Sequence, residues 1–566
     1  MRFKFLPFLA ALLAVPGCTV PPPATPSHAA VKGVVSAADS RAAEAGAEML
    51  RLGGSATDAA LATLIALTVV EPQSSGIGGG GFLVHHAARG DVTSYDGRET
   101  APMAADGDWF FRDGKPLETR QAIPGGRSVG VPGNVRMMGQ AHDAHGKLAW
   151  ARLFGPAIRL ARDGFAITPR LNRFLGSYRA TGALSVEARA LFYDSAGQPK
   201  PAGTIIRNPG LAAFLETLAA RGPDSFYVGP NARAIAATVS NSERNPAPMS
   251  VGDIAAYDAK PRAPVCGMYR AHRICGMGPP SSGGTTVFAI LKQLERFDLG
   301  RLGPASPVSW HLFTESTRLA FADRDKYLAD ADHVVVPVAG LIDPGYLAER
   351  SALIAADRTM ASVAAGTPTG APPATAGLGP VEQGTSHFVA VDAQGNVASL
   401  TSTIESAFGS GLMVNGYYLN NELTDFSFVP SVNGVPVANR VEAGKRPRSS
   451  MAPTIVYGPD GRVRLAVGAA GGATIIAQVA KAIIGVVDWN LSAQEAIALP
   501  VLFAPRDTVF VERGSAHEAM IPALVALGHK DVRTREPGYK ANAIEWRDGH
   551  WIGAADPRSE GAVVAE

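Results

Sequence analysis

The chain has 566 residues, enough to bury a large core, and its 46% hydrophobic and 18% charged residues are ordinary for a globular protein. The formal net charge of +2 gives no electrostatic argument for a nucleic-acid-binding protein. Three cysteines are too few for a disulfide-stabilised scaffold.

The first 31 residues predict a signal peptide and a tether. Residues 1–18 have a basic start and an apolar run that is too short to span a membrane. The sequence before Cys18 is similar to a bacterial lipoprotein cleavage site, so we expect a periplasmic protein with Cys18 as a candidate lipidation site. Pro16 is unusual at such a site, and cleavage without lipidation is the alternative. Residues 19–31 are rich in Pro and Ala and predict a tether.

Two helices are predicted next. Residues 40–52 carry apolar side chains at helical spacing and end at a pair of glycines. Residues 57–70 predict a second, more buried helix with Ser55 as its N-cap. Further helical patterns occur at 150–162, 209–220 and 309–329.

A glycine-rich run at 76–81 leads into a predicted strand at 82–86 rather than into a helix. It lacks the Lys of a phosphate-binding loop, so we interpret it as a tight turn that lets backbones pack closely. Residues 91–96 complete the hairpin. His85 and His86 would point to opposite sides of the strand, so we expect no metal site there.

The long helical pattern at 309–329 contains three carboxylates, Glu315, Asp323 and Asp325. Paired carboxylates can indicate a metal or glycosidase site. Nothing else in the sequence supports either, so we expect them on an exposed helix face. Upstream, Cys266 and Cys275 flank a predicted turn, and either a disulfide or two buried thiols fits this spacing.

Residues 359–384 are rich in Gly, Pro, Ala and Thr and predict a loop or a disordered segment. Thr385 follows directly and starts a predicted hairpin with strands at 387–392 and 397–404. A Thr freed at a chain N-terminus can act as a nucleophile with its own α-amine as the base. The alternative is a Thr that only caps a strand.

The stretch from Gly384 resembles the start of the small subunit of γ-glutamyltranspeptidases, N-terminal-nucleophile hydrolases whose precursor cuts itself before a Thr. The resemblance covers nearly all of the chain after about residue 32. It is carried, in order, by the motifs at 98–102, 279–284, 384–387, 420–422, 425–427, 445–451, 471–472 and 556–559.

This resemblance implies an α+β fold, a four-layer αββα sandwich built jointly by a large subunit, 32–384, and a small subunit, 385–566. The precursor would cut itself between Gly384 and Thr385, and the two fragments would stay paired as a heterodimer. It implies no cofactor and no metal. The fold would form one intertwined unit rather than two domains.

The resemblance also implies roles for the catalytic residues. Thr385 is the nucleophile, and the hydroxyl of Thr403 contacts and orients it. The amides of Gly471 and Gly472, in a turn after a predicted strand at 464–467, are candidates for the oxyanion hole.

Six further residues are implied in binding the donor. Arg98, Ser449 and Ser450 would bind its α-carboxylate, and Asp425 with Glu422 beside it would bind its α-ammonium. Glu405 stands where the family often carries Asn. The segment 430–444, a lid in some members, contains no aromatic side chain here.

We therefore expect an enzyme that cleaves γ-glutamyl amides through an ester on Thr385, with water or an amino acid or peptide as acceptor. One alternative is a glutaryl or cephalosporin acylase of the same fold. Its donors lack the α-ammonium, so Asp425 and Glu405 argue against it. A non-catalytic binding lipoprotein is the alternative of another class. We expect no nucleic-acid partner, and membrane contact only through a lipid anchor.

Overall fold

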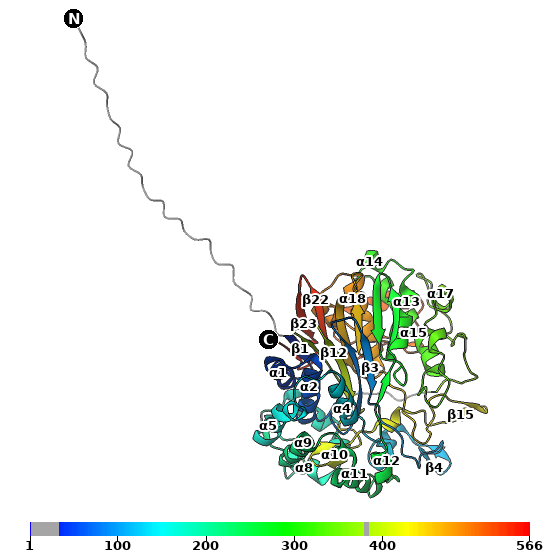
Figure 1. The fold of residues 1–566 in the computed structure, drawn as a ribbon. Coiled ribbons are helices and arrows are strands. Elements are labelled where there is room, and N and C mark those ends of the chain that lie inside the picture. The colour runs from blue at the N-terminus through cyan, green and yellow to red at the C-terminus, as the bar shows by residue number, and fades with distance from the viewer. Residues whose placement is uncertain (2–32, 378–383) are drawn as a thin grey trace. The chain divides into compact units, whose positions relative to one another are not determined.

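The structure is a computed structural model that describes Met1, residues 33–377 and residues 384–566. The predicted signal peptide with Cys18, the predicted tether and residues 378–383 lie outside the described residues. Lys32–Glu566 forms one compact unit (Figure 1). The chain on both sides of residue 384 belongs to this unit.

Two antiparallel sheets form its centre. The first has the strand order β24-β1-β11-β12-β2-β3-β8 and the second β23-β22-β18-β17-β10-β9. The strands of the first sheet, in that order, are Ala562–Ala565, Gly33–Ala37, Ser386–Asp392, Val397–Thr403, Gly80–His86, Val92–Asp96 and Lys260–Arg262. Those of the second are His550–Ala555, Lys540–Arg547, Val463–Ala470, Thr454–Tyr457, His272–Gly276 and Val265–Tyr269. Both sheets combine strands from before and after residue 384, so a cut there leaves the fragments interlocked.

Helices cover both outer faces of the sheets. On one side, α1 (Ser40–Arg51) packs on β1, and α2 (Ala56–Val70) packs on β11 and β12. On the other side, α13 (Gly283–Leu294) packs on β9 and β10, and α18 (Thr474–Val487) packs on β18. The longest helix, α15 (Pro307–Tyr327), lies against α13. The predicted four-layer αββα sandwich is confirmed.

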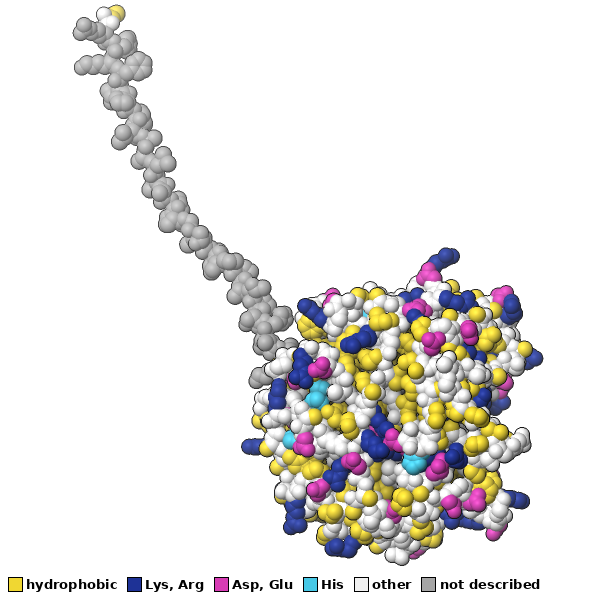
Figure 2. Space-filling view, turned by 45° about the vertical axis from the view of Figure 1, so that its right-hand side comes forward, with side chains coloured by type: hydrophobic (Ala, Val, Ile, Leu, Met, Phe, Trp, Pro, Cys, Tyr) yellow, Lys and Arg dark blue, Asp and Glu magenta, His cyan; other side chains and the backbone are white. Residues whose placement is uncertain are grey.

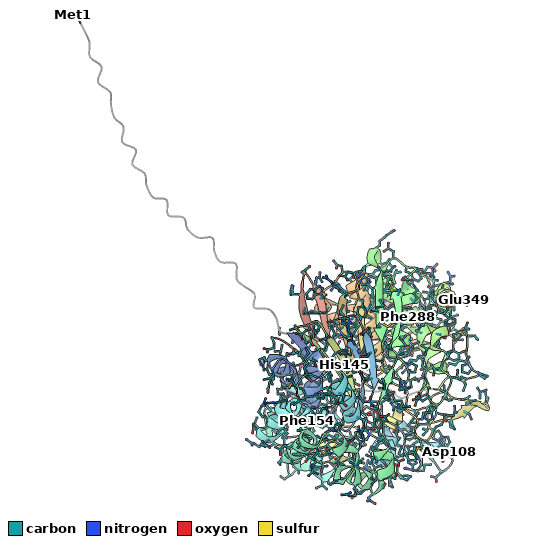
Figure 3. All side chains as sticks on the ribbon, viewed as in Figure 1. Met1, Asp108, His145, Phe154, Phe288 and Glu349 are labelled. Atoms are coloured by element: carbon teal, nitrogen blue, oxygen red, sulfur yellow. A yellow bond between two sulfur atoms is a disulfide. The ribbon has the colours of Figure 1, made fainter. Side chains whose placement is uncertain are left out.

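Two hydrophobic cores follow from these layers. The first, which contains Phe154, lies between the first sheet and its helices. The second, which contains Phe288, fills the space between the sheets and continues under α13 and α18. Figure 3 labels both rings, one in each half of the fold. The central strands β11, β12 and β18 are almost wholly buried because each sheet is covered on both faces.

The remaining helices and strands lie around these layers. The helices are α3 (Thr119–Ala122), α4 (Asn134–His145), α5 (Gly155–Asp163), α6 (Pro169–Ser177), α7 (Arg179–Gly182), α8 (Val186–Phe192), α9 (Pro209–Arg221), α10 (Asp224–Tyr227), α11 (Pro230–Ser240), α12 (Val251–Ala255), α14 (Leu299–Leu302), α16 (Val338–Leu341), α17 (Pro344–Ala352), α19 (Ala493–Ala498) and α20 (Ile521–Ala526). The short strands are β4 (Phe111–Arg112), β5 (Lys115–Pro116), β6 (Phe165–Ala166), β7 (Ile205–Ile206), β13 (Met413–Val414), β14 (Tyr417–Tyr418), β15 (Ser431–Val432), β16 (Val435–Pro436), β19 (Leu502–Phe503), β20 (Thr508–Glu512) and β21 (Asp531–Arg535).

The local predictions near the start of the fold are confirmed. Ser55 caps α2 in a capping box, with its Oγ accepting from Asp58 N–H at 3.1 Å and its own N–H donating to Asp58 at 2.8 Å. The glycine run is a close-packing turn, because a Cβ at Gly79 would lie 1.9 Å from the carbonyl oxygen of Thr403. This close approach places the turn beside the end of β12.

Three other predictions are refined or corrected. The helical pattern at 150–162 begins as a 3-10 helix, Trp150–Phe154, before α5. Cys266 and Cys275 face each other across β9 and β10 and form a disulfide. The prediction that the carboxylates of α15 lie on an exposed face is wrong. Glu315, Asp323 and Asp325 are buried and pair with arginines, because α13 and later segments cover this helix.

Among the described residues, no helix is both long enough and apolar enough to cross a membrane. On the face shown in Figure 2, basic and acidic side chains are interspersed among polar and apolar ones. This mixture agrees with the small net charge of the chain.

Candidate active site

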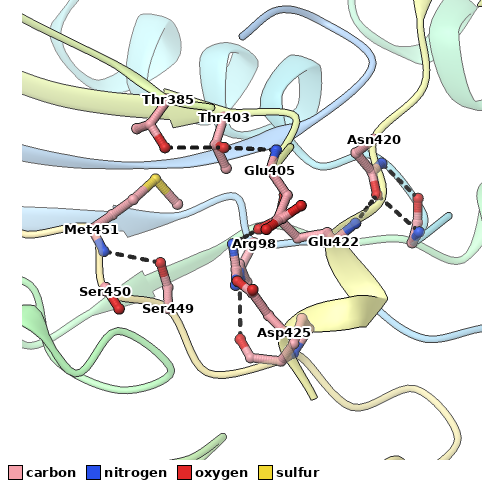
Figure 4. A network of polar contacts seen from close by, with 12 residues as sticks. Arg98, Thr385, Thr403, Glu405, Asn420, Glu422, Asp425, Ser449, Ser450 and Met451 are labelled. Carbon is pink, nitrogen blue, oxygen red and sulfur yellow. Dashed lines mark hydrogen bonds and ion pairs between the residues drawn. The ribbon is translucent and has the colours of Figure 1, made fainter. Parts of the chain in front are cut away.

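Thr385 lies buried at the start of β11, next to the end of β12 (Figure 4). Its hydroxyl donates to the carbonyl oxygen of the preceding Gly384 and lies 3.3 Å from the hydroxyl oxygen of Thr403. The antiparallel register, which pairs Ser386 with Ser402, brings the two threonines together. The predicted pair of Thr385 and Thr403 is therefore adjacent in the uncut chain.

Thr403 is oriented toward the bond that would be cut. Its oxygen accepts a hydrogen bond from the N–H of Glu405 at 2.8 Å and donates to the carbonyl oxygen of Gly384 at 2.9 Å. Gly384 is held from its other side, since its N–H donates to the carbonyl oxygen of Glu405 at 2.6 Å. A Cβ at Gly384 would lie 2.4 Å from that oxygen, so the site requires glycine here. This arrangement polarises the Gly384 carbonyl group toward attack by Thr385.

Gly471 and Gly472 form the turn between β18 and α18, as predicted. Both have positive φ angles, 124° and 60°, which favour glycine. The hydroxyl of Thr474 donates to the Gly471 carbonyl oxygen at 2.7 Å, and Gln478 donates to the Ala470 carbonyl oxygen at 2.8 Å. The start of α18 thus fixes the turn whose amides are the oxyanion-hole candidates.

Arg98 lies fully buried, and Figure 4 shows it between Glu405 and Asp425 on the side of the site away from Thr385. Its guanidinium group donates to Glu422 and, at 2.5 Å, to Asp425. It also donates to the carbonyl oxygens of Pro447 and Arg448, both at 3.0 Å. The structure thus brings Arg98, Glu422 and Asp425 together, with the guanidinium group already engaged by two carboxylates.

Four carboxyl groups surround Arg98 in total, because Glu99 and Glu405 join Glu422 and Asp425. Burial raises the pKa of Glu99 to about 8, and neither of its oxygens accepts a hydrogen bond from a described residue. Burial, together with the neighbouring carboxyl groups, raises the pKa of Glu422 well above its ordinary value, and burial also raises the pKa of Asp425. Glu99 therefore keeps its proton at neutral pH, which lowers the negative charge gathered around Arg98.

Glu405 connects the nucleophile to this pocket. Its φ angle of 75° lies in the left-handed region, which costs a non-glycine residue on the order of 1 kcal/mol. Its carboxylate accepts a hydrogen bond from Asn421, while its backbone N–H holds Thr403. The strained residue thus directs its carboxylate toward the carboxyl groups around Arg98 and its amide toward Thr403.

Ser449 and Ser450 lie beside Arg98, directly after Arg448. The hydroxyl of Ser449 accepts from the N–H of Met451 at 3.1 Å, and the hydroxyl of Ser450 accepts from Arg324 at 2.7 Å. Arg324 therefore supplies a second guanidinium group behind the serines. Sequence reasoning missed Arg324 and Glu99. Arg324 lies inside a helix whose pattern is ordinary. Glu99 belongs to the motif at 98–102, but nothing in that motif singles it out from Arg98.

Histidines and carboxylates gather at one other place in the described part of the chain. His311, Glu315 and His529 have ligand atoms within 4.8 Å of one another. The ring nitrogens His311 Nδ1 and His529 Nε2 form a hydrogen bond of 2.8 Å, and the guanidinium group of Arg318 donates to the carboxylate of Glu315 at 2.8 Å. These contacts give the cluster a structural explanation without an ion.

Within the segment 430–444, β15 and β16 form an exposed hairpin, whereas residues 437–439 and Val441 are buried. Phe428, just before it, stacks on Phe110 with ring centroids 4.1 Å apart. This ring is therefore engaged with the large-subunit region. The hairpin itself offers valine and proline but no aromatic side chain.

Comparison with known proteins agrees with this geometry. The family model described as gamma-glutamyltranspeptidase matches residues 42–566. A glutathione hydrolase proenzyme of Bacillus subtilis is 34% identical over 545 residues, 94% of this chain and 91% of its own length. An acylase ACY 1 proenzyme of a Pseudomonas species is 35% identical over 544 residues, 94% of this chain and 93% of its own.

Two solved structures are similar to this fold. A cephalosporin acylase from Bacillus halodurans has a TM-score of 0.83 at 25% identity and covers 98% of this chain and 99% of its own. A gamma-glutamyltranspeptidase of Helicobacter pylori has a TM-score of 0.55 at 34% identity over 57% of this chain and 91% of its own.

Proposed function

The chain belongs to the γ-glutamyltranspeptidase family, and from this premise we propose that it is a γ-glutamyl hydrolase and transferase with Thr385 as its nucleophile. The observation that carries the proposal is the contact of Thr385, Thr403 and the Gly384 carbonyl group in the uncut chain. Relatives that are proenzymes support maturation of this chain by self-cleavage into a two-chain heterodimer.

Self-cleavage would proceed in two steps. Thr385 Oγ attacks the carbonyl carbon of Gly384, and Thr403 donates to the oxyanion that forms. The bond from this carbon to the Thr385 nitrogen breaks, the nitrogen takes the proton of the hydroxyl group, and an ester remains. Water then opens the ester, which leaves a carboxylate on Gly384 and a free α-amine on Thr385.

In the mature enzyme the free α-amine of Thr385 would serve as the base. Its ordinary pKa of roughly 7.7–8.0 suits this task near neutral pH. The hydroxyl oxygen attacks the γ-carbonyl carbon of the donor, and the proton passes through the α-amine to the leaving amine. The amides of Gly471 and Gly472 would stabilise the oxyanion. Water then releases glutamate, or an amino acid or peptide amine takes the γ-glutamyl group.

The donor pocket favours an amino acid end group on the substrate. The carboxylates of Asp425, Glu422 and Glu405 can hold an α-ammonium group. Arg98 can take the α-carboxylate once Glu422 or Asp425 turns from the guanidinium group to that ammonium group. Ser449 and Ser450, with Arg324 behind them, would complete the carboxylate site.

The acylase of the same fold is the second candidate, favoured by the similarity to acylases over almost the whole chain. A glutaryl donor has no α-ammonium group, so it would give the buried carboxyl groups of Asp425, Glu422 and Glu405 no cationic partner from the donor. We therefore expect a higher kcat/KM for a γ-glutamyl anilide than for a glutaryl anilide, with Asp425→Asn narrowing the gap. A glutaryl anilide as the better substrate of the wild type would transfer the assignment to the acylase.

A denaturing gel of the purified protein tests the proposal directly. We expect two fragments for the wild type, with Thr385 at the new N-terminus, and one full-length chain for Thr385→Ala. A wild type that stays uncut, or a Thr385→Ala variant that still cuts at this bond, contradicts the mechanism. An uncut wild type would instead favour a non-catalytic binding lipoprotein.

We also propose that the enzyme faces the periplasm and is tethered to the membrane by a lipid on Cys18. The basic start, the apolar run and the cysteine at residue 18 support this proposal. Mass spectrometry of the mature N-terminus tests it. A free N-terminus without a lipid would leave a periplasmic protein without an anchor.

A further inference from the structure

The turn after α2, residues 71–75, forms hydrogen bonds to Ser386 and Ile404, the residues that directly follow Thr385 and Thr403. We call this segment the α2 turn. The carbonyl oxygen of Ser74 accepts a hydrogen bond from Ile404 N–H at 3.2 Å. The carboxylate of Glu71 accepts one from the hydroxyl of Ser386 at 2.7 Å. A single segment from before the cut therefore contacts both strands that carry the catalytic pair.

Lys540 closes this arrangement from the second sheet. Its buried ammonium group lies 2.7 Å from Glu71 Oε2, 3.1 Å from Ser386 Oγ and 3.4 Å from Ser74 Oγ. An ammonium group has three N–H donors, and each has an acceptor here. Because Ser386 also donates to Glu71, the four side chains form one closed network, which we call the Lys540 network.

The backbone of Lys540 ties this network to the candidate oxyanion hole. Lys540 is the first residue of β22 and pairs with Ala470, the last residue of β18. Gly471 and Gly472 follow directly. Glu71 and Ser74 come from before the cut, whereas Lys540 comes from after it. The network therefore spans the two fragments and touches the nucleophile strand and the oxyanion turn at once.

We infer that Lys540 is a positioning residue, which sets the distance between Thr385 and the amides of Gly471 and Gly472 by anchoring the strands that carry them to the α2 turn of the other fragment. The inference deepens the proposed function and rests on it, because it takes Thr385 as the nucleophile. Positioning matters because a displacement of about 1 Å at a reacting centre can cost roughly 10²-fold in rate. Neither Lys540 nor Glu71 has to touch the substrate for this effect.

The charge of Lys540 gives the inference a pH signature. Three charged groups face it: Glu71 and Asp39, which raise its pKa, and Arg170, which lowers it. Burial outweighs them and lowers the pKa of Lys540 to about 8. Above that pH the ammonium group loses a proton and its attraction to Glu71. Glu71→Gln should shift this loss to lower pH, because it removes a charge that favours the ammonium form.

The experiment compares Lys540→Met with Lys481→Met. Lys481 is an equally buried lysine of α18, and its ammonium group is held by backbone carbonyl oxygens, including those of Ala496 and Ile497. For Lys540→Met we expect the rate of self-cleavage and kcat for hydrolysis to fall about 10- to 100-fold, with KM within about twofold. The alkaline fall of wild-type kcat near pH 8 should be absent in this variant. Lys481→Met should keep the wild-type kcat and pH profile in its folded fraction.

Wild-type rates in a folded Lys540→Met variant would overturn the inference, and so would an equal loss in Lys481→Met. If Lys540→Met does not fold, the double variant Glu71→Gln/Lys540→Met removes both buried charges and tests the same loss. A wild type that does not cut itself would overturn the proposed function and this inference together. If the wild type cuts itself and the Lys540 variants have normal rates, the inference is overturned and the proposed function stands.

Discussion

Around Thr385 the polar contacts join uncharged groups: two hydroxyls, the Gly384 carbonyl oxygen and a backbone N–H. Nearby in the fold (Figure 4), the guanidinium group of Arg98 lies among four carboxyl groups. Both regions are buried and share Glu405, which contributes its amide to the first and its carboxylate to the second. They differ in whether the uncut chain already supplies hydrogen-bond partners for all of their polar atoms.

The difference shows which region depends on a partner. The nucleophile has its acceptor, its orienting hydroxyl and its target carbonyl carbon within the same chain, so it is preorganised to cut itself. In the candidate donor pocket, Arg98 donates to one carboxyl oxygen each of Glu422 and Asp425, and the second oxygen of each accepts no hydrogen bond from a described residue. A ligand with an ammonium group would supply the missing donors. The nucleophile should therefore respond to loss of a hydroxyl, and the pocket to changes of charge.

The largest effect is expected from Thr403→Val, which keeps the shape of the side chain and removes its hydroxyl. Because this hydroxyl donates to the Gly384 carbonyl oxygen, we expect self-cleavage to slow roughly 10²- to 10³-fold. The half-time of precursor loss on denaturing gels measures it. Thr403→Ser restores the donor and should recover most of the rate. Equal rates for Thr403→Val and the wild type would exclude Thr403 from the reaction.

The next effect separates the pocket from the nucleophile. Arg98→Lys replaces a planar fork with a point charge, so we expect KM for a γ-glutamyl anilide to rise about tenfold or more while kcat changes less. Arg270→Lys, an arginine that pairs with Asp488 outside the site, is the matched control and should keep the wild-type KM. An unchanged KM in Arg98→Lys would remove Arg98 from donor binding.

The same contrast limits what the sequence can predict. Thr385 stands at the start of a hairpin whose alternation and turn are local, so its strand could be predicted from the residues alone, whereas Thr403 as its partner comes from the family resemblance. Local physics also predicts Ser55 as a cap and the glycine run as a close-packing turn. These signals depend on residues that are near one another along the chain.

The parts that could not be predicted are made by residues far apart in the sequence. Glu71 and Lys540 are 469 positions apart, and each looks ordinary in its own segment: a helix end and a strand residue. The carboxylates of α15 were expected in solvent because a helix pattern does not show what later segments will cover. The protonated state of Glu99 likewise depends on burial beside Glu422, which only the assembled fold creates.

A smaller effect is expected in stability rather than rate. Burial raises the pKa of Glu99 to about 8 in the folded chain, so between its ordinary pKa and pH 8 the unfolded chain ionises while the folded chain keeps the proton. Stability from this group is full below its ordinary pKa and is lost as pH rises through about 8. Glu99→Gln should remove that slope and stabilise the chain near pH 8. We expect an effect on the order of 1–2 kcal/mol, less than an isolated group with this pKa would give, because the neighbouring carboxyl groups titrate together with Glu99.

Denaturant unfolding of Glu99→Gln in the uncut Thr385→Ala background, at about pH 5 and about pH 8, measures this effect without the complication of two chains. Glu118→Gln, at an exposed carboxylate remote from the pocket, is the control and should show no change in slope. A Glu99→Gln variant with the same pH dependence as its parent would contradict a protonated Glu99.

The smallest effect concerns the fate of the ester on Thr385. An aromatic lid can exclude water from an acyl-enzyme and so help an amine acceptor compete. Here the hairpin of β15 and β16 carries no aromatic ring, and Phe428 is stacked on Phe110. We therefore expect hydrolysis to be a major outcome, with transfer rising only at high acceptor concentration and at high pH, where the amine is unprotonated. Product partitioning between glutamate and γ-glutamyl-glycylglycine measures this ratio.

Val435→Trp, at an exposed position of the hairpin, should raise the share of transfer by a few-fold if an aromatic lid controls the access of water. Val525→Trp, at an exposed position of α20, should leave this share unchanged. Dominant transfer by the wild type at low acceptor concentration and neutral pH would show that the pocket already excludes water without such a ring.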